Sequence, residues 1–420
     1  MSGAGTGRVL MIEPMTSAVT MLQAAAGLGW STAAATWDAG DRRMPDHVRA
    51  GVDTLIVIDP NDEQALWTAV LAEHRIAPFT AVLPGIEFYV ATAARLADRL
   101  GLPGLPVDRV DALRDKVLMR SVLAEAGLPG PATACIDEAG DLAGAAAHVG
   151  FPAVFKPRDS AGSIHVSRVD DVAQLDSAYA AMVADPRPDD VGRPIGSRAV
   201  LEGYLEGPEV SADGYIGPDG AVVLSVTHKV LSEEPHFVEI GHSVAGHADP
   251  FDAAELRARI LNYTDRVCRA LGATAGPFHC ELRLPGGEPT LVEIGARLPG
   301  GRIVALIEWT TGVQLPVLAL TAAAGLPLGS LGGFGRPDTP FAGVHNFTAP
   351  HLDVVRAVIG VEWLRSQDWV REVTIDVEPG DSVPEFGDFR CRLGQALFVA
   401  DSRDELQQRR LQVARAVRFG

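Results

Sequence analysis

The sequence predicts a multidomain protein that combines α/β and α+β regions and begins with a doubly wound parallel sheet. Three observations lead to this prediction. The chain has 420 residues, enough for two or three domains with cores of their own. Short apolar strands alternate with helical segments in its first quarter. The later part contains a hairpin of two amphipathic strands and ends with short strands and a helix.

The composition excludes several classes of protein. The hydrophobic fraction of 47% is typical of globular proteins, and a net charge of −18 argues against nucleic-acid binding, which needs a basic surface. The four cysteines form no CxxC pair, so neither a zinc site nor a disulfide framework is indicated and a reducing cytoplasm is expected. We find no signal-peptide pattern, and the longest apolar run, 315–326, is too short to span a membrane.

The N-terminal domain is predicted over residues 1–108. Strands and helices are expected to alternate as strand 8–12, helix 16–28, strand 31–37, strand 54–58, helix 61–74, strand 80–83 and helix 87–100. This alternation predicts a parallel sheet. The glycines Gly3, Gly5 and Gly7 precede the first strand instead of following it, so they do not form a dinucleotide-binding loop.

The next segments contain two lysines in unusual positions. A helix is predicted from Val110 to Glu125, with Lys116 near its start. Lys156 ends the apolar strand 151–157, and its charge needs a partner if it is buried. A Gly/Ser-rich loop over 158–163 follows, and then a predicted strand 164–166. Small residues let backbone N–H groups approach an anion, although a plain hairpin turn remains an alternative.

A predicted hairpin places two acids opposite each other. Residues 278–284 and 290–295 alternate apolar and polar side chains, and turn residues lie between them. If the turn is 286–288, Glu281 and Glu293 face each other, whereas a one-residue slip separates them. Facing carboxylates repel, and a Mg²⁺ ion that also binds substrate phosphates would offset this repulsion. Two solvated surface acids are the alternative interpretation.

The remaining segments are predicted as follows. Residues 200–211 form a strand, a hinge and a second strand, and another strand spans 221–229. Residues 231–250 form a long loop with functional potential, in which solvated histidines are favoured over a metal site. Asp252 caps a helix that ends at Leu271. Further helices cover 302–309 and 313–325, and a small α+β appendage follows with strands 343–347, 370–377 and 396–399 and helix 403–418.

The order and spacing of five motifs resemble those of the ATP-grasp ligase superfamily over roughly residues 107–345. The motifs are Asp115-Lys116, Lys156 before the Gly/Ser loop, Glu202-x-x-Leu205-x-Gly207-x-Glu209, His279-x-Glu281 and Glu293-x-x-x-Arg297. The segments 276–282, 293–301 and 237–242 are most similar to the L-amino-acid ligases, which make dipeptides in bacterial secondary metabolism. The resemblance implies an N-terminal pre-ATP-grasp domain (1–108), an ATP-grasp small subdomain with the phosphate loop (109–203), a large subdomain with the metal-binding hairpin (204–338) and a C-terminal α+β appendage (339–420).

The resemblance also implies roles for individual residues. ATP and one or two Mg²⁺ ions are expected, with Mn²⁺ as an alternative ion. Lys116, Lys156 and Lys229 would contact the ATP phosphates, over which the loop that contains Ser160, Gly162 and Ser163 would close. The adenine would be bound by Glu202, Tyr204 and Leu205, and the ribose by Glu209. The metal would be bound by Glu281 and Glu293. Arg297 and Lys156 would stabilise the transferring phosphoryl group. Glu239, His242 or Glu233 would accept the proton of the attacking amine.

The implied function is that of an ATP-dependent carboxylate–amine ligase. It would join amino acids, or an amino acid and a related acid, through an acyl phosphate, in pathways such as antibiotic biosynthesis. One position departs from the family, because Gly295 stands where many members have a metal-binding Asn, which leaves the number of metal ions open. An ATP-grasp enzyme of purine or carboxylation type and a non-catalytic ATP-binding module are the alternatives. Amino acids are the expected partners, with no nucleic acid or membrane, and a homodimer is the commonest oligomer.

Overall fold

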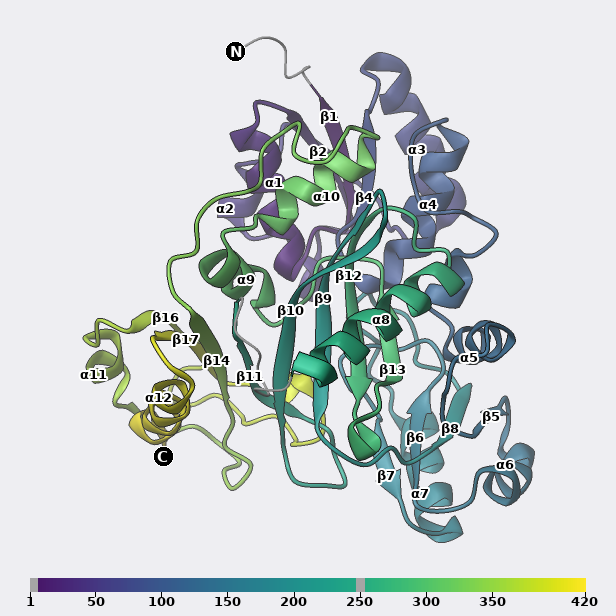
Figure 1. Ribbon diagram of the computed structural model, residues 1–420, viewed down its shortest axis with the longest axis vertical. Coiled ribbons are helices and arrows are strands. Elements are labelled where there is room, and N and C mark those ends of the chain that lie inside the picture. The colour runs from purple at the N-terminus through teal and green to yellow at the C-terminus, as the bar shows by residue number, and fades with distance from the viewer. Residues whose placement is uncertain (1–6, 247–253) are drawn as a thin grey trace.

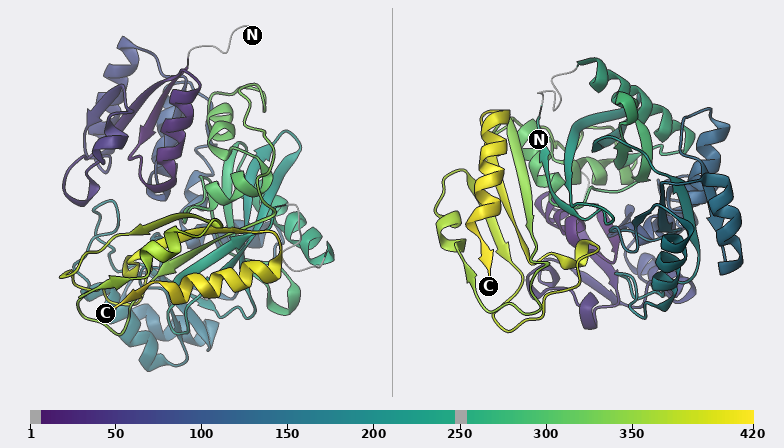
Figure 2. Two further views of the ribbon diagram at one scale, coloured as in Figure 1. Left: turned by 90° about the vertical axis from the view of Figure 1, so that its left-hand side faces the viewer. Right: turned by 90° about the horizontal axis from the view of Figure 1, so that it is seen from below.

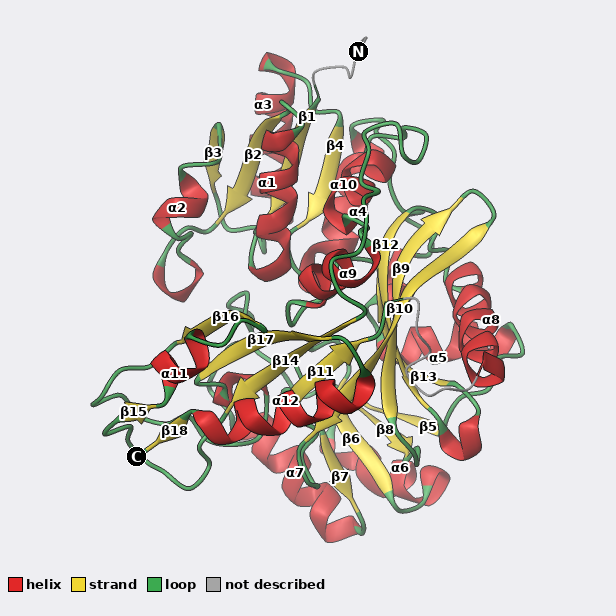
Figure 3. Cartoon of the chain, turned by 60° about the vertical axis from the view of Figure 1, so that its left-hand side comes forward, coloured by secondary structure: helices red, strands yellow, loops and turns green. Residues whose placement is uncertain are grey.

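The computed structural model describes residues 7–246 and 254–420 of the chain (Figure 1). Its described strands form three larger sheets and one small pair of strands. A parallel four-stranded sheet lies at the N-terminal end, an eight-stranded sheet runs through the middle, and a second four-stranded sheet lies at the far end (Figure 3). The predicted succession of an α/β sheet and antiparallel α+β regions is therefore confirmed.

The N-terminal sheet is parallel throughout, with the strand order β3-β2-β1-β4. Its elements are β1 (Arg8–Ile12), α1 (Val19–Gly27), β2 (Ser31–Thr36), α2 (Asp46–Arg49), β3 (Thr54–Val57), α3 (Glu63–Ile76), β4 (Ala81–Pro84) and α4 (Val90–Arg99). Alternate residues of β1 enter two cores, because Val9 and Met11 pack with α1 while Leu10 and Ile12 pack with α3 and α4. Helices thus cover both faces, and the sheet is doubly wound as predicted.

The second four-stranded sheet is antiparallel, with the order β5-β8-β6-β7. Its elements are α5 (Lys116–Glu125), β5 (Thr133–Ile136), α6 (Leu142–Val149), β6 (Ala153–Pro157), β7 (Ser167–Val169), α7 (Val172–Ala184) and β8 (Ala199–Gly203). The continuous helix predicted over 110–125 is wrong, because a 3₁₀ turn covers Val110–Leu113 and α5 begins separately. The side chain of Asp115 caps α5 by accepting two backbone N–H groups of its first turn.

The strand predicted over 164–166 is also wrong. Ser163 and His165 have φ angles of 60° and 53°, so the backbone turns at these residues instead of extending. The loop after β6 is therefore longer than predicted, and β7 begins only at Ser167. This longer loop reaches the cleft described below.

The eight-stranded sheet is antiparallel and has the order β13-β12-β9-β10-β11-β14-β17-β16. Its strands are β9 (Glu209–Gly217), β10 (Gly220–Leu231), β11 (Glu239–Val244), β12 (Gly276–Arg283), β13 (Thr290–Gly295), β14 (Phe341–Phe347), β16 (Val370–Ile375) and β17 (Gly394–Ala400). The helices after residue 253 are α8 (Ala254–Ala270), α9 (Ile303–Thr311), α10 (Leu315–Ala323), α11 (Val361–Arg365) and α12 (Arg403–Ala416). The strands β15 (Val358–Ile359) and β18 (Arg418–Phe419) pair with each other.

The long loop predicted over 231–250 contains a strand. Strand β11 pairs with β10 on one side and β14 on the other. A Cβ at Gly241 would lie 2.6 Å from the carbonyl oxygen of Val344, so this glycine permits a close approach of two strands instead of marking a loop. Residues 247–250 and the predicted cap Asp252 lie outside the described residues.

Strands β14, β17 and β16 of the C-terminal region extend the central sheet, whereas β15 and β18 form a separate pair. Strand β14 pairs with β11 and β17, and β17 pairs with β16. Helix α12 lies along these strands, as two further views show (Figure 2). The C-terminal region therefore shares one continuous hydrogen-bonded sheet with the strands of the hairpin.

The N-terminal sheet and the central sheet share a hydrophobic core. One buried cluster joins Met21 and Leu22 of α1 to Leu306 of α9, Leu315 of α10 and Val344 of β14. The four cysteines are free, which agrees with the absence of a disulfide framework from the sequence. Within the described ranges, no helix combines the length and the apolar character needed to cross a lipid bilayer.

Candidate active site

A cleft lies between the second four-stranded sheet and the eight-stranded sheet. Every residue that the sequence predicted for the site, except His242 and Glu233, lines this cleft. These residues are Lys116, Lys156, Ser160, Gly162, Ser163, Glu202, Tyr204, Leu205, Glu209, Lys229, Glu239, Glu281, Glu293 and Arg297. The structure thus brings together residues that are up to 181 positions apart, from Lys116 to Arg297 (297 − 116).

The hairpin of β12 and β13 has the predicted register at its two acids. Glu281 pairs with Glu293 across the two strands. The register then shifts by one residue, because a bulge leaves Val292 without a ladder partner. The backbone oxygen of Val292 instead accepts a hydrogen bond of 2.8 Å from Arg120. The turn is 285–287 instead of 286–288, and the bulge compensates for this difference.

Cations offset the repulsion between the two acids. The Lys229 ammonium lies 2.5 Å from Glu281, and His279 Nε2 lies 3.0 Å from the same carboxylate. The Lys116 ammonium lies 3.3 Å from Glu293 and also donates to the backbone oxygen of Ser160. Burial alone would raise the pKa of Glu281, but Lys229 and His279 hold this pKa well below its usual value. Glu281 is therefore an ionised carboxylate on the cleft wall.

The donor set fits a metal ion that is shared with a nucleotide. Among the described residues, no three acidic, histidine or cysteine side chains are grouped as a metal site. Two facing carboxylates nevertheless suffice for Mg²⁺, which commonly binds through one or two carboxylates, water and substrate phosphates. Glu281 and Glu293 would supply these two carboxylates, and neighbouring lysines would contact the phosphates.

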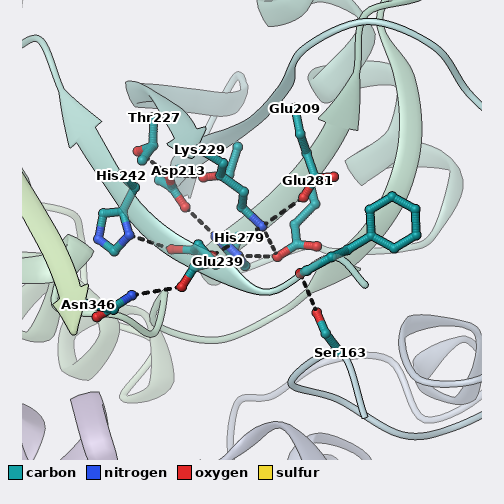
Figure 4. Close-up of polar contacts among 12 residues, drawn as sticks. Ser163, Glu209, Asp213, Thr227, Lys229, Glu239, His242, His279, Glu281 and Asn346 are labelled. Carbon is teal, nitrogen blue, oxygen red and sulfur yellow. Dashed lines mark hydrogen bonds and ion pairs between the residues drawn. The ribbon is translucent and has the colours of Figure 1, made fainter. Parts of the chain in front are cut away.

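Lys229 stands at the centre of a cluster of carboxylates (Figure 4). Besides Glu281, its ammonium lies 3.3 Å from Glu209 and 3.7 Å from Glu239. Burial alone would lower the pKa of Lys229, but the three carboxylates raise this pKa above its ordinary value. Lys229 is therefore a permanent cation that holds acids from three strands together.

A buried network behind Glu281 was missed in the sequence analysis. Asp213 on β9 is fully buried and lies 2.5 Å from His279 Nδ1, while Ser211 and Thr227 each donate to it over 2.7 Å. Burial alone would lower the pKa of His279, but Asp213 and Glu281 raise it to about 9. Polar residues within the otherwise apolar strand of Asp213 were the signal that could have revealed this network.

Glu202 is an anchor for two cations. Its carboxylate lies 2.7 Å from the Lys156 ammonium and accepts two hydrogen bonds, of 2.7 and 3.1 Å, from Arg120. Burial alone would raise the pKa of Glu202, but Arg120 and Lys156 lower it to about 2. Lys156 thus has the partner that its buried position requires. The role of Glu202 toward the adenine amino group stays a prediction.

Two other segments contact the Gly/Ser loop where it lines the cleft. The hydroxyl of Ser163 donates to the backbone oxygen of Phe237 over 3.3 Å. The ring of Phe389, from the C-terminal region, lies so close to Gly162 that a Cβ at this glycine would approach it to 2.5 Å. Gly162 also has a φ of 69°, a conformation that glycine adopts without strain. The loop therefore depends on glycine at this position.

The N-terminal domain contributes Glu87 to the site. The Glu87 carboxylate forms ion pairs with Arg297 and, over 3.1 Å, with Arg114. A side chain at Gly295 would overlap with this carboxylate. The Glu87 carboxylate, from the N-terminal domain, thus fills the space that a side chain at position 295 would take. Burial alone would raise the pKa of Glu87, but the two arginines lower it.

Glu239 and His242 form a pair on β11. Glu239 lines the cleft, whereas His242 is fully buried behind it and contacts the Glu239 carboxylate through Nδ1. Although burial alone would raise the pKa of Glu239, His242 and Lys229 lower it to about 2. His242 Nε2 has no hydrogen-bond partner within the described structure. The other candidate base, Glu233, is exposed and lies outside the cleft wall.

Family models match three parts of the chain. An ATP-grasp N-terminal domain matches residues 22–104, an ATP-grasp domain matches 149–305, and L-amino acid ligase C-terminal domain 2 matches 346–420. The chain belongs to the ATP-grasp superfamily. The fold of this superfamily implies binding of ATP and Mg²⁺, which agrees with the cleft.

Several known proteins are similar to this ATP-grasp chain. It is 31% identical to dapdiamide A synthase of Enterobacter agglomerans over 62% of its own length and 59% of that protein. It is 22% identical to the L-arginine-specific L-amino acid ligase of Bacillus subtilis over 84% of its length and 83% of that protein. The crystal structure of L-amino acid ligase from Bacillus licheniformis superposes with a TM-score of 0.82, at 22% identity, over 100% of this chain and 99% of the other.

Proposed function

We propose that the protein is an ATP-dependent carboxylate–amine ligase that joins two amino acids, or an amino acid and a related acid. The observation that carries this proposal is the pair of facing carboxylates, Glu281 and Glu293, in a cleft that also presents Lys116, Lys156 and Arg297. Two named relatives, the dapdiamide A synthase and the L-arginine-specific ligase, support amino acids as the substrates. Antibiotic-type secondary metabolism is the corresponding setting.

The nucleotide would lie between the two sheets. We propose that the backbone of Tyr204 and Leu205, which follow β8, contacts the adenine, and that Glu209 contacts the ribose. Lys156 and Lys116 would contact the phosphates, with the loop around Ser160 closed over them. Both lysines are buried, with 5% and 3% exposure, so their charges act in a medium that screens them weakly.

Glu281 and Glu293 would hold Mg²⁺ against the phosphates. The bound ion would neutralise phosphate charge and align the reacting groups. Because Gly295 supplies no side chain, we propose that water and phosphate oxygens complete the coordination, and that the protein uses one or two ions. Mn²⁺ would be accepted in place of Mg²⁺.

In the first step, an oxygen of the substrate carboxylate attacks the γ-phosphorus of ATP. The bond from this phosphorus to the β,γ-bridging oxygen breaks, and ADP leaves. The product is an acyl phosphate, whose phosphate is a much better leaving group than oxide. Lys156 and Arg297 would stabilise the charge on the transferring group. The closed Gly/Ser loop excludes water, which would otherwise hydrolyse the acyl phosphate.

In the second step, the amine nitrogen attacks the acyl carbon. The new C–N bond forms, the C–O bond to phosphate breaks, and inorganic phosphate leaves. An ammonium group must first lose a proton, and the amide nitrogen loses a second one. We propose that the Glu239 carboxylate, which lies on the cleft wall, receives the ammonium group, and that the imidazole of His242 behind it takes up the proton.

Two alternatives are less well supported. ATP-grasp enzymes of purine or carboxylation type share the fold, but the match of residues 346–420 to an L-amino acid ligase domain favours amino acids. A non-catalytic ATP-binding module would not need the facing carboxylates, two phosphate lysines and Arg297 together. We retain the domain division 1–108, 109–203, 204–338 and 339–420, and a homodimer in solution, as parts of the proposal.

A matrix of amino-acid pairs tests the proposed function. Each pair is incubated with the protein, ATP and Mg²⁺, ADP and phosphate release are measured, and products are identified by mass. We expect at least one pair to release ADP only when both amino acids are present, with a product equal to their combined mass minus water. ADP release that needs no amine, or ATP binding without ADP from any pair, would contradict the proposal.

A further inference from the structure

Arg392 is a cation of the cleft that the reaction above does not use. It follows the 3₁₀ turn Phe389–Cys391 in the C-terminal region and lines the same cleft as Glu281 and Glu293. It therefore reaches the site from a part of the sequence that is far from the second four-stranded sheet. Its surroundings differ from those of every other cation in the cleft.

All other lysines and arginines that line the cleft have a carboxylate partner. The pairs are Lys116 with Glu293 (3.3 Å), Lys156 with Glu202 (2.7 Å), Lys229 with Glu281 (2.5 Å), Arg283 with Glu209 (3.1 Å) and Arg297 with Glu87. Arg392 has no carboxylate within 4.0 Å in the described part of the chain. Its guanidinium group therefore forms no ion pair, although its charge contributes to the lowered pKa of Glu239.

The position of this guanidinium group is nevertheless fixed. Arg392 Nη2 donates to the backbone oxygen of Glu239 over 3.1 Å, and Nε is buried without a hydrogen-bond partner in the described structure. Three residues earlier, the backbone N–H of Phe389 donates to Gly162 of the Gly/Ser loop over 3.4 Å. Arg392 as a whole is half-buried, and a buried N–H group without an acceptor is costly unless a ligand supplies one.

We propose that Arg392 binds the α-carboxylate of the amino acid that acts as the amine. This inference rests on the proposed function. The amine substrate keeps its carboxylate throughout the reaction, so it needs a cation that is not engaged by the phosphates. In an α-amino acid one carbon separates the carboxylate from the nitrogen, so the groups that bind them must be neighbours. Arg392 meets this requirement because it is hydrogen-bonded to Glu239, whose side chain would receive the amino group.

The guanidinium group suits this role. Its planar donors match the two oxygens of a carboxylate, whereas an ammonium group provides only a point charge. The contact would make the protein select α-amino acids over amines that have no carboxylate. A hydrogen bond to a charged group gives discrimination of roughly 10- to 100-fold when one partner is removed.

The first test uses the unmodified protein. For the best pair from the matrix, the amine substrate is compared with its α-carboxamide, which has the same side chain and amino group. We expect kcat/KM for the carboxamide to be lower by about 10- to 100-fold, mainly through a higher KM. Equal kcat/KM values for the two compounds would overturn the assignment of Arg392.

The second test separates the two halves of the reaction with hydroxylamine. Hydroxylamine carries no carboxylate and attacks acyl phosphates, with release of phosphate and formation of a hydroxamate. In Arg392→Met we expect dipeptide formation to fall by about 10- to 100-fold through KM for the amine. Hydroxamate formation and KM for ATP should stay unchanged, and Arg392→Lys should restore part of the loss. Arg390→Gln is the control, because Arg390 is bound to Asp388 and lies outside the cleft wall.

The possible results distinguish this inference from the proposed function. Unchanged dipeptide formation in Arg392→Met overturns the inference, and so does an equal loss of hydroxamate and dipeptide in a variant that ATP still stabilises against heat. If Arg392→Met does not fold, the carboxamide comparison decides the question. If the unmodified protein forms neither ADP nor hydroxamate with any acid, the proposed function itself is wrong.

Discussion

At the scale of single residues, the site depends on acids that are balanced by cations. Glu293 shows this balance, because its only cationic neighbour within 4.0 Å in the described chain is Lys116. Glu293 is also one of just two carboxylates that face each other across the hairpin. Its replacement should therefore affect chemistry more than folding, since the side chain retains 23% exposure.

We predict that Glu293→Gln lowers ADP formation by at least about 100-fold, because removing even a residue that only orients a metal ligand costs about 10- to 100-fold. The amide keeps the size of the side chain but loses the charge that Mg²⁺ requires. The measurement is coupled ADP release at saturating ATP, with the midpoint of thermal unfolding as the check on folding. Glu288→Gln is the matched control, since Glu288 lies on the exposed turn of the same hairpin. Turnover near normal in Glu293→Gln would remove the metal assignment.

Gly295 shows what a sequence can and cannot indicate about one residue. The sequence indicated that position 295 lacks the metal-binding Asn side chain of many family members. It did not indicate that Glu87, from the N-terminal domain, fills the space and pairs with Arg297. This contact joins residues 208 positions apart (295 − 87), and no local pattern encodes such a distance.

At the scale of elements, the hairpin was predictable because alternation and turn residues act over a few positions. The facing of Glu281 and Glu293 followed from this alternation. Strand β11 was not predictable in this way, because Gly241 and His242 are typical of loops, yet neighbouring strands pair with both edges of β11. Glu239 lines the cleft with the other predicted residues, but it lies on a strand and not on the predicted loop. Whether residues 239–244 form a strand or a loop is decided by their pairing with strands that lie far away in the sequence.

The contact between the Gly/Ser loop and the C-terminal region leads to a prediction about coupling. In Phe389→Ala the ring that packs on Gly162 is removed, so the loop should open more often and admit water to the acyl phosphate. We expect the ratio of ADP to dipeptide to rise several-fold above one, with faster hydrogen exchange at 159–164. Phe334→Ala is the control, because Phe334 is 55% exposed. A ratio that stays at one, with unchanged exchange, would show that Phe389 does not hold the loop.

At the scale of the whole molecule, the site is assembled from all regions of the chain. The N-terminal domain supplies Glu87, the two sheets of the cleft supply the lysines and acids, and the C-terminal region supplies Phe389 and Arg392. Strand β14 is central to this assembly, since it joins β11 to the C-terminal strands β17 and β16. The stability of β14 therefore bears on the stability of the complete fold.

His345 on β14 makes this stability depend on pH. Burial, together with the positive charge of Arg410, lowers the pKa of His345 to about 4 in the folded chain, whereas an unfolded chain has the ordinary value near 6.5. Between pH 6.5 and 4 the unfolded chain thus binds more protons than the folded one. The free energy of unfolding must therefore fall as the pH decreases from 6.5 to 4, and His345 contributes up to about 3 kcal/mol to this fall. Above pH 6.5 His345 makes no contribution to the pH dependence of stability.

We therefore predict that His345→Gln flattens the acid side of the stability profile. The measurement is urea-induced unfolding at pH values between 4.5 and 7.5 for both proteins. Above pH 7 the difference in unfolding free energy between variant and parent reports only the changed packing near Phe347, whose ring contacts that of His345. Below pH 6.5 this difference should shift in favour of the variant, which takes up no proton at position 345. His351→Gln, at an exposed histidine, should keep the slope of the parent protein. Equal acid slopes for His345→Gln and the parent would show that His345 is protonated as readily in the folded chain as in the unfolded one.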